Sequence, residues 1–399
     1  MTASVSEYPN HRRQLFLAFA VILAAALALL VAGPAQASGE GEPADGDALC
    51  MPEVYAEMAA GCSMLGPAAY IDRVTRMGVE LPARPVPASA PSADLVQLDY
   101  RYAQVMSPNA PMYATLDDAS GGGKPASRLE SGFDFVSYQE MVEVSGHRYF
   151  LLRSGEWMYG GDLSRIGAVS PFQGLLIHAP LDRPFGWILQ PTESKRSPGY
   201  ENQADYTGHS LNRYDQVQVY GSQEVNDIKW LLIGPDEWIE ERFAGVVYSN
   251  PTPPEGVTNG RWIEVNLYEQ TIMVYEDSRL IYATMMSSGL PGFWTRPGLF
   301  QIETKLESTP MRGAFEADRS DFYFLQDVPW TMYFDESRAF HGAYWHNGYG
   351  YPRSHGCVNL SPGDARWLFD WADEGDWVYV WDPSGNTPVD PDAYGAGGA

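Results

Sequence analysis

The chain has 399 residues, and its 51 Asp and Glu against 26 Lys and Arg leave a formal charge of −25. Such an acidic chain lacks the basic face that phosphate binding needs, which argues against a nucleic-acid partner. Apolar residues make up 45% of the chain, enough for sizeable cores, and no long apolar run recurs after the first one. A polytopic membrane protein is therefore excluded. The 39 Gly and 30 Pro favour turn-rich, strand-rich folds.

The first 37 residues have the pattern of an export signal. Arg12 and Arg13 precede an uncharged apolar run over residues 15–31, and Ala35-Gln36-Ala37 supplies the small residues of a cleavage site. We expect residues 1–37 to be removed from an exported, extracytoplasmic protein. The apolar run is short for a membrane span, and an uncleaved anchor is the alternative.

Export changes the interpretation of the cysteines, of which the chain has three. Cys50 and Cys62 lie close together in residues 38–80, a short segment with helical character. An oxidising compartment favours a disulfide between them, and two buried thiols are the alternative. Cys357 is left over, and an unpaired cysteine in an exported protein calls for an explanation.

Composition divides the rest of the chain into blocks. Residues 81–94 are rich in Pro and Ala, which is typical of an extended linker, and residues 249–259 have a similar composition. Residues 383–399 consist mostly of Pro, Gly, Asp and Ala, and we expect them to be disordered. Two folded blocks remain, residues 95–248 and 260–382.

The first block contains a faint repeat. Tyr149 and Trp157 are followed by Trp230 and Trp238 at the same offset of 81 residues, each pair within short strand-like runs broken by Gly and Pro. About 75 residues of short strands suit a small β-barrel. We therefore expect two β-barrel modules, residues 95–168 and 169–248, which weakly resemble bacterial Src-homology-3-like wall modules. Two barrels that serve only as structural spacers are the alternative.

The second block is predicted to be mostly β-structure with one helix packed on it. Residues 262–267, 271–275 and 280–285 alternate as strands do, and residues 276–278 form the turn of a hairpin. A helix is predicted to begin after Ser361, with Pro362 at its first position, and to end at Gly375.

Histidine and cysteine gather in one stretch of this block. Three of the chain's seven His lie between residues 341 and 357, where Cys357 also lies. A sulfur nucleophile must be a thiolate, and a neighbouring imidazole is the usual means of making one. Gly356 would let a substrate carbonyl approach backbone N–H groups. A zinc site is disfavoured because the stretch lacks HExxH and a cysteine pair with metal-ligand spacing.

Residues 354–359, SHGCVN, together with the upstream pair His341-Gly342, resemble the signature of the L,D-transpeptidase catalytic domain of the YkuD type. The resemblance extends over residues 260–382, with supporting matches at residues 287–290, 295–300 and 328–334. It implies a mainly β fold: a β-sandwich with one packed helix, preceded here by the two β-barrel modules and the short cystine segment.

The resemblance implies a role for each signature residue. Cys357 would be the nucleophile and His341 the general base, with His346 as the alternative base. Ser354 or a backbone carbonyl would orient an imidazole. His355 belongs to the signature with a more structural role.

Substrate-binding roles follow in the same way. The backbone N–H groups of Gly356 and Cys357 would line an oxyanion hole, and Asn359 would hold the loop or the stem peptide. Arg353 or Arg296 would meet a substrate carboxylate.

By this resemblance the protein is expected to cross-link peptidoglycan stem peptides in the cell wall, or to anchor a protein there, through a cysteine acyl-enzyme that releases D-Ala. No metal or other cofactor is implied, and carbapenems are expected to acylate Cys357. An L,D-carboxypeptidase with the same site and a wall-binding protein with an idle catalytic domain are the alternatives.

Overall fold

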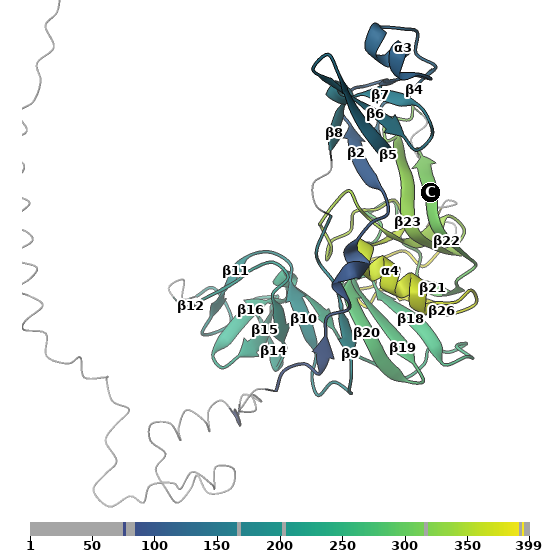
Figure 1. The fold of residues 1–399 in the computed structure, drawn as a ribbon. Helices are drawn as coiled ribbons and strands as arrows, with labels where there is room; N and C mark the ends of the chain where they lie inside the picture. Colours follow the sequence, from purple (N-terminus) through teal and green to yellow (C-terminus); the bar gives the residue numbers. More distant parts are fainter. Residues whose placement is uncertain are drawn as a thin grey trace, which may run out of the picture. The chain divides into compact units, whose positions relative to one another are not determined.

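The computed structural model describes residues 75–76, 84–165, 169–201, 205–314, 318–390 and 393–394. The predicted signal and the Cys50–Cys62 disulfide lie outside these residues. The described chain is mainly β-structure, as predicted (Figure 1). None of its helices is both long and apolar enough to span a bilayer.

Residues 93–165, here called the N-terminal module, form a unit of mainly β-structure that overlaps the first predicted module. Its long hairpin turns at Ser145 and Gly146, which both have positive φ, as tight hairpin turns require. Ala103, Val136, Phe150, Leu152 and Met158 fill its core. Its elements are η1 Ala93–Val96, β2 Arg101–Val105, β3 Pro111–Met112, α3 Leu116–Gly121, β4 Ser127–Arg128, β5 Phe133–Val144, β6 His147–Leu152, β7 Trp157–Tyr159, η2 Gly160–Asp162 and β8 Leu163–Arg165.

Residues 185–248, here called the middle module, form the second β unit. Its strands make two sheets, in the orders β13-β10-β17 and β12-β11-β16-β15-β14. Ile188, Leu231, Ile239 and Val246 are buried in its core. Its elements are β10 Phe185–Ile188, β11 Thr192–Lys195, β12 Tyr206–Leu211, β13 Gln216–Gln218, β14 Gly221–Val225, β15 Ile228–Gly234, β16 Glu237–Glu240, η3 Glu241–Phe243 and β17 Ala244–Val247.

Residues 260–382, here called the C-terminal domain, contribute strands to two sheets. One sheet has the order β1-β9-β20-β19-β18-β26-β21, and the other contains β25-β24-β23 with β22 beside β23. Its elements are β18 Arg261–Asn266, β19 Thr271–Glu276, β20 Arg279–Met285, β21 Gly298–Gln301, β22 Thr304–Gly313, β23 Tyr323–Asp335, β24 Arg338–Gly342, β25 Val358–Leu360, α4 Pro362–Trp371 and β26 Trp377–Trp381.

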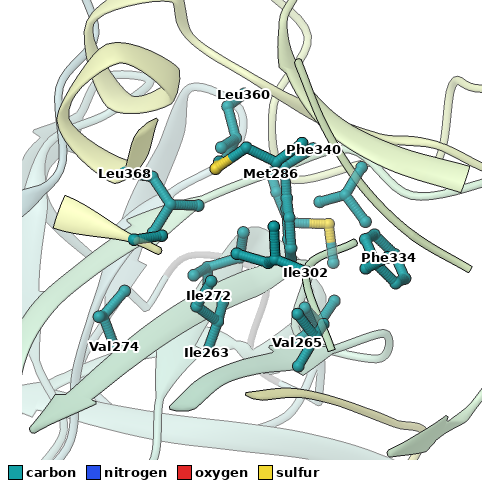
Figure 2. Close-up of a cluster of buried hydrophobic side chains, with 14 of the residues drawn as sticks. Ile263, Val265, Ile272, Val274, Met286, Ile302, Phe334, Phe340, Leu360 and Leu368 are labelled. Carbon is teal, nitrogen blue, oxygen red and sulfur yellow. The ribbon is translucent and has the colours of Figure 1, made fainter. Parts of the chain in front are cut away.

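An apolar core joins these two sheets and the helix. Alternate residues of β18, such as Ile263 and Val265, meet Phe334 of β23 and Leu368 of α4 in one buried cluster (Figure 2). The predicted helix cap is confirmed, because the hydroxyl of Ser361 accepts a hydrogen bond from the N–H of Asp364 at 3.1 Å. The helix ends at Trp371, four residues before the expected Gly375.

The boundaries between the predicted blocks differ in the structure, because strands from the N-terminal half complete the C-terminal sheets. β1 (Ala88–Ser89) lies within the predicted linker at 81–94, and it pairs with β9 (Leu175–Ile177). β9 in turn pairs with β20 of the C-terminal domain. β5 of the N-terminal module pairs in parallel with β23. Unpaired strand edges are thereby covered, which isolated barrels and a flexible linker would not achieve.

The predicted disorder after residue 382 is wrong for residues 383–390. The carboxylate of Asp382 accepts hydrogen bonds from the backbone of Ser384 at 2.8 Å and of Thr387 at 2.8 Å. Thr387 is buried, and Arg338 lies over the ring of Tyr394 at 5.3 Å. Side-chain capping of this kind orders a short polar segment that composition alone marks as disordered.

Candidate active site

A cleft of about 230 Å³ contains six of the seven residues predicted to form the site. The parallel pairing of β24 with β25 sets His341 opposite Asn359, so the end of one strand lies beside the loop that carries Cys357. The cleft is lined by His341, Arg353, Ser354, His355, Cys357 and Asn359, together with Phe133, Met311, Asp321, Tyr323, Leu325 and Trp345. The structure therefore brings the signature residues together, as the resemblance implied.

The loop before Cys357 is held by the segment that supplied the supporting sequence matches. The backbone of Ser287 exchanges hydrogen bonds with Asn359 at 2.9 and 2.8 Å, and the N–H of Leu290 donates to Ser354 at 2.9 Å. The hydroxyl of Thr295 donates to the carbonyl of Gly356 at 2.9 Å. Gly356 has a φ of +121°, which a residue with a side chain rarely adopts. The motif needs glycine at this position for its backbone conformation.

The residues predicted to be the nucleophile and the base, Cys357 and His341, are both uncharged at neutral pH. Burial raises the pKa of the Cys357 thiol to about 11, against opposing effects of the Ala339 N–H and of Arg338. Burial also lowers the pKa of His341 to about 4, and a backbone contact with Gly342 opposes it. The thiol donates a weak hydrogen bond to the carbonyl of Ser337 at 3.6 Å. At neutral pH these pKa values favour a neutral thiol and a neutral imidazole over an ion pair.

His341 has the free capacity that a base needs. Its Nδ1 is buried and has no hydrogen-bond partner among the described residues. Its ring lies 5.6 Å from the indole ring of Trp345. A neutral imidazole with an unoccupied nitrogen can accept a proton, and the role of His341 as the base stays a prediction.

His346, the alternative base, is engaged elsewhere. Its Nδ1 accepts a hydrogen bond from the N–H of Gly348 at 3.1 Å, so its proton is on Nε2, which lies 3.1 Å from the side-chain amide of Asn359. Burial and the charges of Arg353, His341 and Arg213 lower its pKa to about 3. His346 therefore holds Asn359 in place.

The contact between His346 and Asn359 determines the orientation of the Asn359 side-chain amide. The structure places the amide nitrogen of Asn359 at Nε2 of His346, but two donors cannot form a hydrogen bond. We therefore assign the amide oxygen to face His346 and the NH2 group to point the other way. That other end of the amide is buried without a hydrogen-bond partner among the described residues. Asn359 thus holds the loop, as predicted, and presents a donor in the cleft.

Ser354 and the Gly356 N–H have roles that differ from the predicted ones. The hydroxyl of Ser354 accepts from the Gly356 N–H at 3.1 Å and donates to the carbonyl of Cys357. It closes the turn around the nucleophile and does not orient an imidazole. The Gly356 N–H is already bonded, which leaves the N–H of Cys357 as the remaining member of the predicted oxyanion pair.

The other predicted residues lie at the edges of the cleft. The ring of His355 stacks on Tyr323 with centroids 5.4 Å apart and meets Phe293 edge-on at 4.6 Å, in keeping with a structural role. Arg353 is exposed and donates to the carbonyl of Gly348 at 3.2 Å. Arg296 is ion-paired with Asp335, so of the two candidates for a substrate carboxylate Arg353 is the one in the cleft.

Sequence reasoning missed the wall of the cleft that comes from β22, β23 and the N-terminal module. Met311, Tyr323 and Leu325 belong to the β22–β23 hairpin, and Phe133 begins β5. Figure 1 shows this hairpin beside β5. Phe133 is 46% exposed, and such an apolar side chain at a cleft suits a substrate contact. No motif marks it, because it reaches the site only through long-range strand pairing.

The N-terminal module also supports the segment that carries His341. Tyr102 stacks on Tyr344, with ring centroids 3.6 Å apart, and donates its hydroxyl hydrogen to the carbonyl of Asp327 at 2.8 Å. Tyr344 contacts Trp345 edge-on, and Trp345 contacts the ring of His341. Aromatic packing of this kind limits movement of the base.

In the described parts of the chain no group of three or more His, Cys, Asp or Glu side chains is placed to hold a metal ion. A buried thiol, an unpartnered imidazole and a cleft over them define a candidate thiol acyltransferase of the cysteine–histidine type.

Residues 260–380 match the family model of the YkuD L,D-transpeptidase catalytic domain. This segment is therefore a YkuD-type L,D-transpeptidase catalytic domain, as its signature indicated. Among curated proteins the chain is 28% identical over 127 residues to YciB of Bacillus subtilis (strain 168), whose name places it with the L,D-transpeptidases. The match covers 27% of this chain and 59% of that protein.

Solved structures of L,D-transpeptidases match a similar share of the chain. One from Stackebrandtia nassauensis is 29% identical, with a TM-score of 0.25, over 33% of this chain and 58% of that one. The C442S mutant from Enterococcus faecium is 27% identical, with a TM-score of 0.28, over 31% of this chain and 50% of that one. The chain thus spans little more than half the length of these relatives.

Proposed function

We propose that the protein is a peptidoglycan L,D-transpeptidase that works through an acyl-enzyme on Cys357. The observation that carries the proposal is the cleft in which Cys357 lies with an unpartnered His341, inside a domain of the YkuD type. We also propose that it acts after export, in the cell wall, because residues 1–37 have the pattern of a signal.

The first half of the reaction forms a thioester. His341 accepts the proton of the Cys357 thiol, and the sulfur attacks the carbonyl carbon of the third residue of a tetrapeptide stem. The Cys357 N–H and the Asn359 amide stabilise the negative oxygen of the tetrahedral intermediate. The bond to the terminal D-Ala then breaks, and its departing amine takes the proton from His341.

The second half transfers the acyl group. An acceptor amine attacks the thioester and gives its proton to His341. The carbon–sulfur bond breaks, the new amide is released, and the sulfur recovers the proton from His341. If water replaces the amine, the product is a trimmed stem, and the enzyme is an L,D-carboxypeptidase.

The test is mass spectrometry of the purified protein with a disaccharide-tetrapeptide stem. We expect a mass increase on the peptide that contains Cys357, release of D-Ala and dimeric muropeptides. Trimmed monomers without dimers would favour the carboxypeptidase, and absence of any acylation would overturn the proposal.

A second arm uses a carbapenem, whose strained carbonyl is a reactive acyl donor. Intact-protein mass should show one adduct on the native protein and none on Cys357→Ala. Equal labelling of the two proteins would rule out Cys357 as the acyl-accepting thiol.

A further inference from the structure

A second cavity, of about 760 Å³, lies away from the catalytic cleft. It forms where the end of the middle module and the segment 249–255 meet β18 and β26 of the catalytic domain. Its lining includes Glu241, Tyr248, Glu264, Tyr268, Glu269 and Trp381. None of its lining residues lines the catalytic cleft. The proposed acyl transfer therefore makes no use of this cavity.

Negative charge dominates this cavity. Glu264 and Glu269 are 5% and 6% exposed, so both are more than nine-tenths buried. Lys229 also lines it, but its ammonium is already paired with Glu241 at 2.5 Å. The carboxylates of this cavity therefore outnumber its one cationic side chain, and a buried carboxylate that lacks a partner of its own is costly.

Glu264 is the side chain that points most directly to a ligand. Glu269 accepts a hydrogen bond from the N–H of Val246 at 2.8 Å, whereas the contact of the Glu264 carboxylate is with the indole of Trp381. In the described part of the chain the indole N–H of Trp381 has no partner within hydrogen-bond geometry, so this contact leaves the carboxylate unsatisfied. A buried carboxylate without a hydrogen bond, in the wall of a cavity, can accept a hydrogen bond from a ligand that enters the cavity.

Aromatic rings complete the wall. Tyr379 and Trp381 lie along β26 with their rings within 10° of parallel, and Tyr248 and Tyr268 line the cavity with them. Lys229 already lies 5.9 Å from the centre of the Tyr248 ring, so this wall tolerates an ammonium group. Carboxylates beside aromatic faces form the usual recognition surface for an alkylammonium ion.

We propose that this cavity binds a primary alkylammonium group on an apolar stem, such as a lysine-type side chain of a peptide. An anion is excluded by the surplus of carboxylates. A neutral ligand would leave Glu264 and Glu269 without a counter-charge, whereas an ammonium ion donates to the carboxylate and contacts the aromatic rings.

The proposal has a pH signature. Burial raises the pKa of Glu264 and of Glu269 to about 7, and an ammonium ion favours their charged forms. The ligand amine stays protonated below about pH 10, so its affinity should increase from pH 6 to pH 8. The other titratable or charged groups around the two carboxylates are Lys229, Glu241, Tyr248, Glu255, Tyr268, Tyr275 and Tyr379.

Calorimetric titration of the full chain carrying Cys357→Ala tests binding without any catalysis. The probe is Nα-acetyl-lysine amide, and the matched control is Nα-acetyl-norleucine amide, which has a similar apolar stem but no amine. We expect saturable binding of the lysine probe at pH 8 and at least about tenfold weaker binding of the norleucine probe. Because the nucleophile is absent, the result is independent of the proposed transpeptidation.

Two variants locate the site. Glu264→Gln should weaken binding of the lysine probe at least about tenfold, because an amide cannot neutralise the ammonium ion. Glu255→Gln removes an exposed carboxylate at the same cavity and should change the affinity by less than about twofold. If Glu264→Gln fails to fold, the pH series on the Cys357→Ala chain decides, with tighter binding expected at pH 8 than at pH 6.

Several results would overturn the proposal. Equal affinity for the lysine and norleucine probes would show that the amine is not recognised. Unchanged affinity in a folded Glu264→Gln variant, or affinity that does not change with pH, would remove Glu264 from the site. Binding of N-acetylglucosamine but not of the lysine probe would assign the cavity to a saccharide.

Discussion

In the proposed reaction, Cys357 and His341 begin uncharged. The raised pKa of the thiol, about 11, and the lowered pKa of the imidazole, about 4, both follow from burial. An ion pair in an empty cleft would be poorly solvated, so the proton is transferred only when a substrate carbonyl is present to receive the electron pair. This arrangement protects a buried thiol from side reactions with small electrophiles at neutral pH.

The pH dependence of alkylation tests this state. Because only the thiolate reacts, the rate of Cys357 modification by iodoacetamide should rise about tenfold per pH unit from pH 7 to pH 10. His341→Gln should keep this slope, since the imidazole is neutral throughout that range. Peptide mass spectrometry follows the Cys357 peptide alone. A rate that levels off below pH 8 would show a preformed thiolate instead.

The two buried histidines should differ in their effect on chemistry. His341→Gln removes the proton acceptor, and we expect acylation of Cys357 by a carbapenem to slow by about 10² to 10³. His346→Gln loses only the support of Asn359 and should slow it by less than about tenfold. Time-resolved intact mass measures both rates. The opposite order of effects would identify His346 as the base.

Among the elements, the pairing of β5 with β23 connects the N-terminal module to the cleft. Besides the parallel ladder, the N–H of Phe133 donates to the carbonyl of Phe322 at 2.9 Å, and the N–H of Ser137 donates to Gln326 at 3.1 Å. An unpaired β22–β23 hairpin would be free to move over Cys357. Its attachment to β5 keeps Tyr323 and Leu325 in the wall of the cleft.

A substitution at Gly132 would disturb the attachment of β5 to β23. A Cβ at Gly132 would lie 2.1 Å from the carbonyl oxygen of Phe322, which is a backbone clash. Gly132→Ala should separate the start of β5 from β23, lower the melting temperature and slow acylation by a stem peptide by at least about tenfold. Hydrogen exchange of the β23 amides should increase.

The matched control is Gly121→Ala in α3, where a Cβ would meet nothing within 4 Å. This change should leave both the melting temperature and the acylation rate close to those of the native protein. If Gly132→Ala behaves in the same way, the β5–β23 contact does not control the cleft.

At the scale of the whole molecule, the catalytic domain depends on strands and side chains from the rest of the chain. β9 covers the edge of β20, and β5 covers part of β23. Trp262, Met273 and Tyr275 of the catalytic domain are buried in one cluster with Phe185, Trp187 and Val247 of the middle module. The two modules therefore contribute directly to the stability of the catalytic fold.

A chain reduced to residues 258–390 tests this dependence. It would expose the edges of β20 and β23 and the apolar cluster around Trp262, so we expect aggregation or a melting temperature lower by at least about 10 °C. Circular dichroism and size-exclusion chromatography measure the two outcomes. A chain that begins at residue 84 keeps these contacts and serves as the control. A monomeric short chain with an unchanged transition would show an independent domain.

The chemistry of the site could be predicted from the sequence. Cys357, His341 and Gly356 lie within 17 residues of sequence, in the motif whose roles the family resemblance implied, and β24 and β25 that flank this stretch pair with each other. The turn at Asp277 and Ser278 and the cap at Ser361 were also predictable, because they depend on local backbone preferences. Local signals of this kind do not need the rest of the fold.

Only the tertiary structure decided which segments complete the site. Phe133 and Tyr102 lie 224 and 255 residues before Cys357. Phe133 reaches the cleft through strand pairing, and Tyr102 supports it by stacking on Tyr344, and no local pattern encodes either contact. The occupied N–H of Gly356 and the engagement of His346 with Asn359 depend on distances between side chains. The second cavity also forms only where β26 meets the middle module, because burial of Glu264 requires both surfaces. Sequence determines the reactive groups here, and long-range packing determines their surroundings and ionisation.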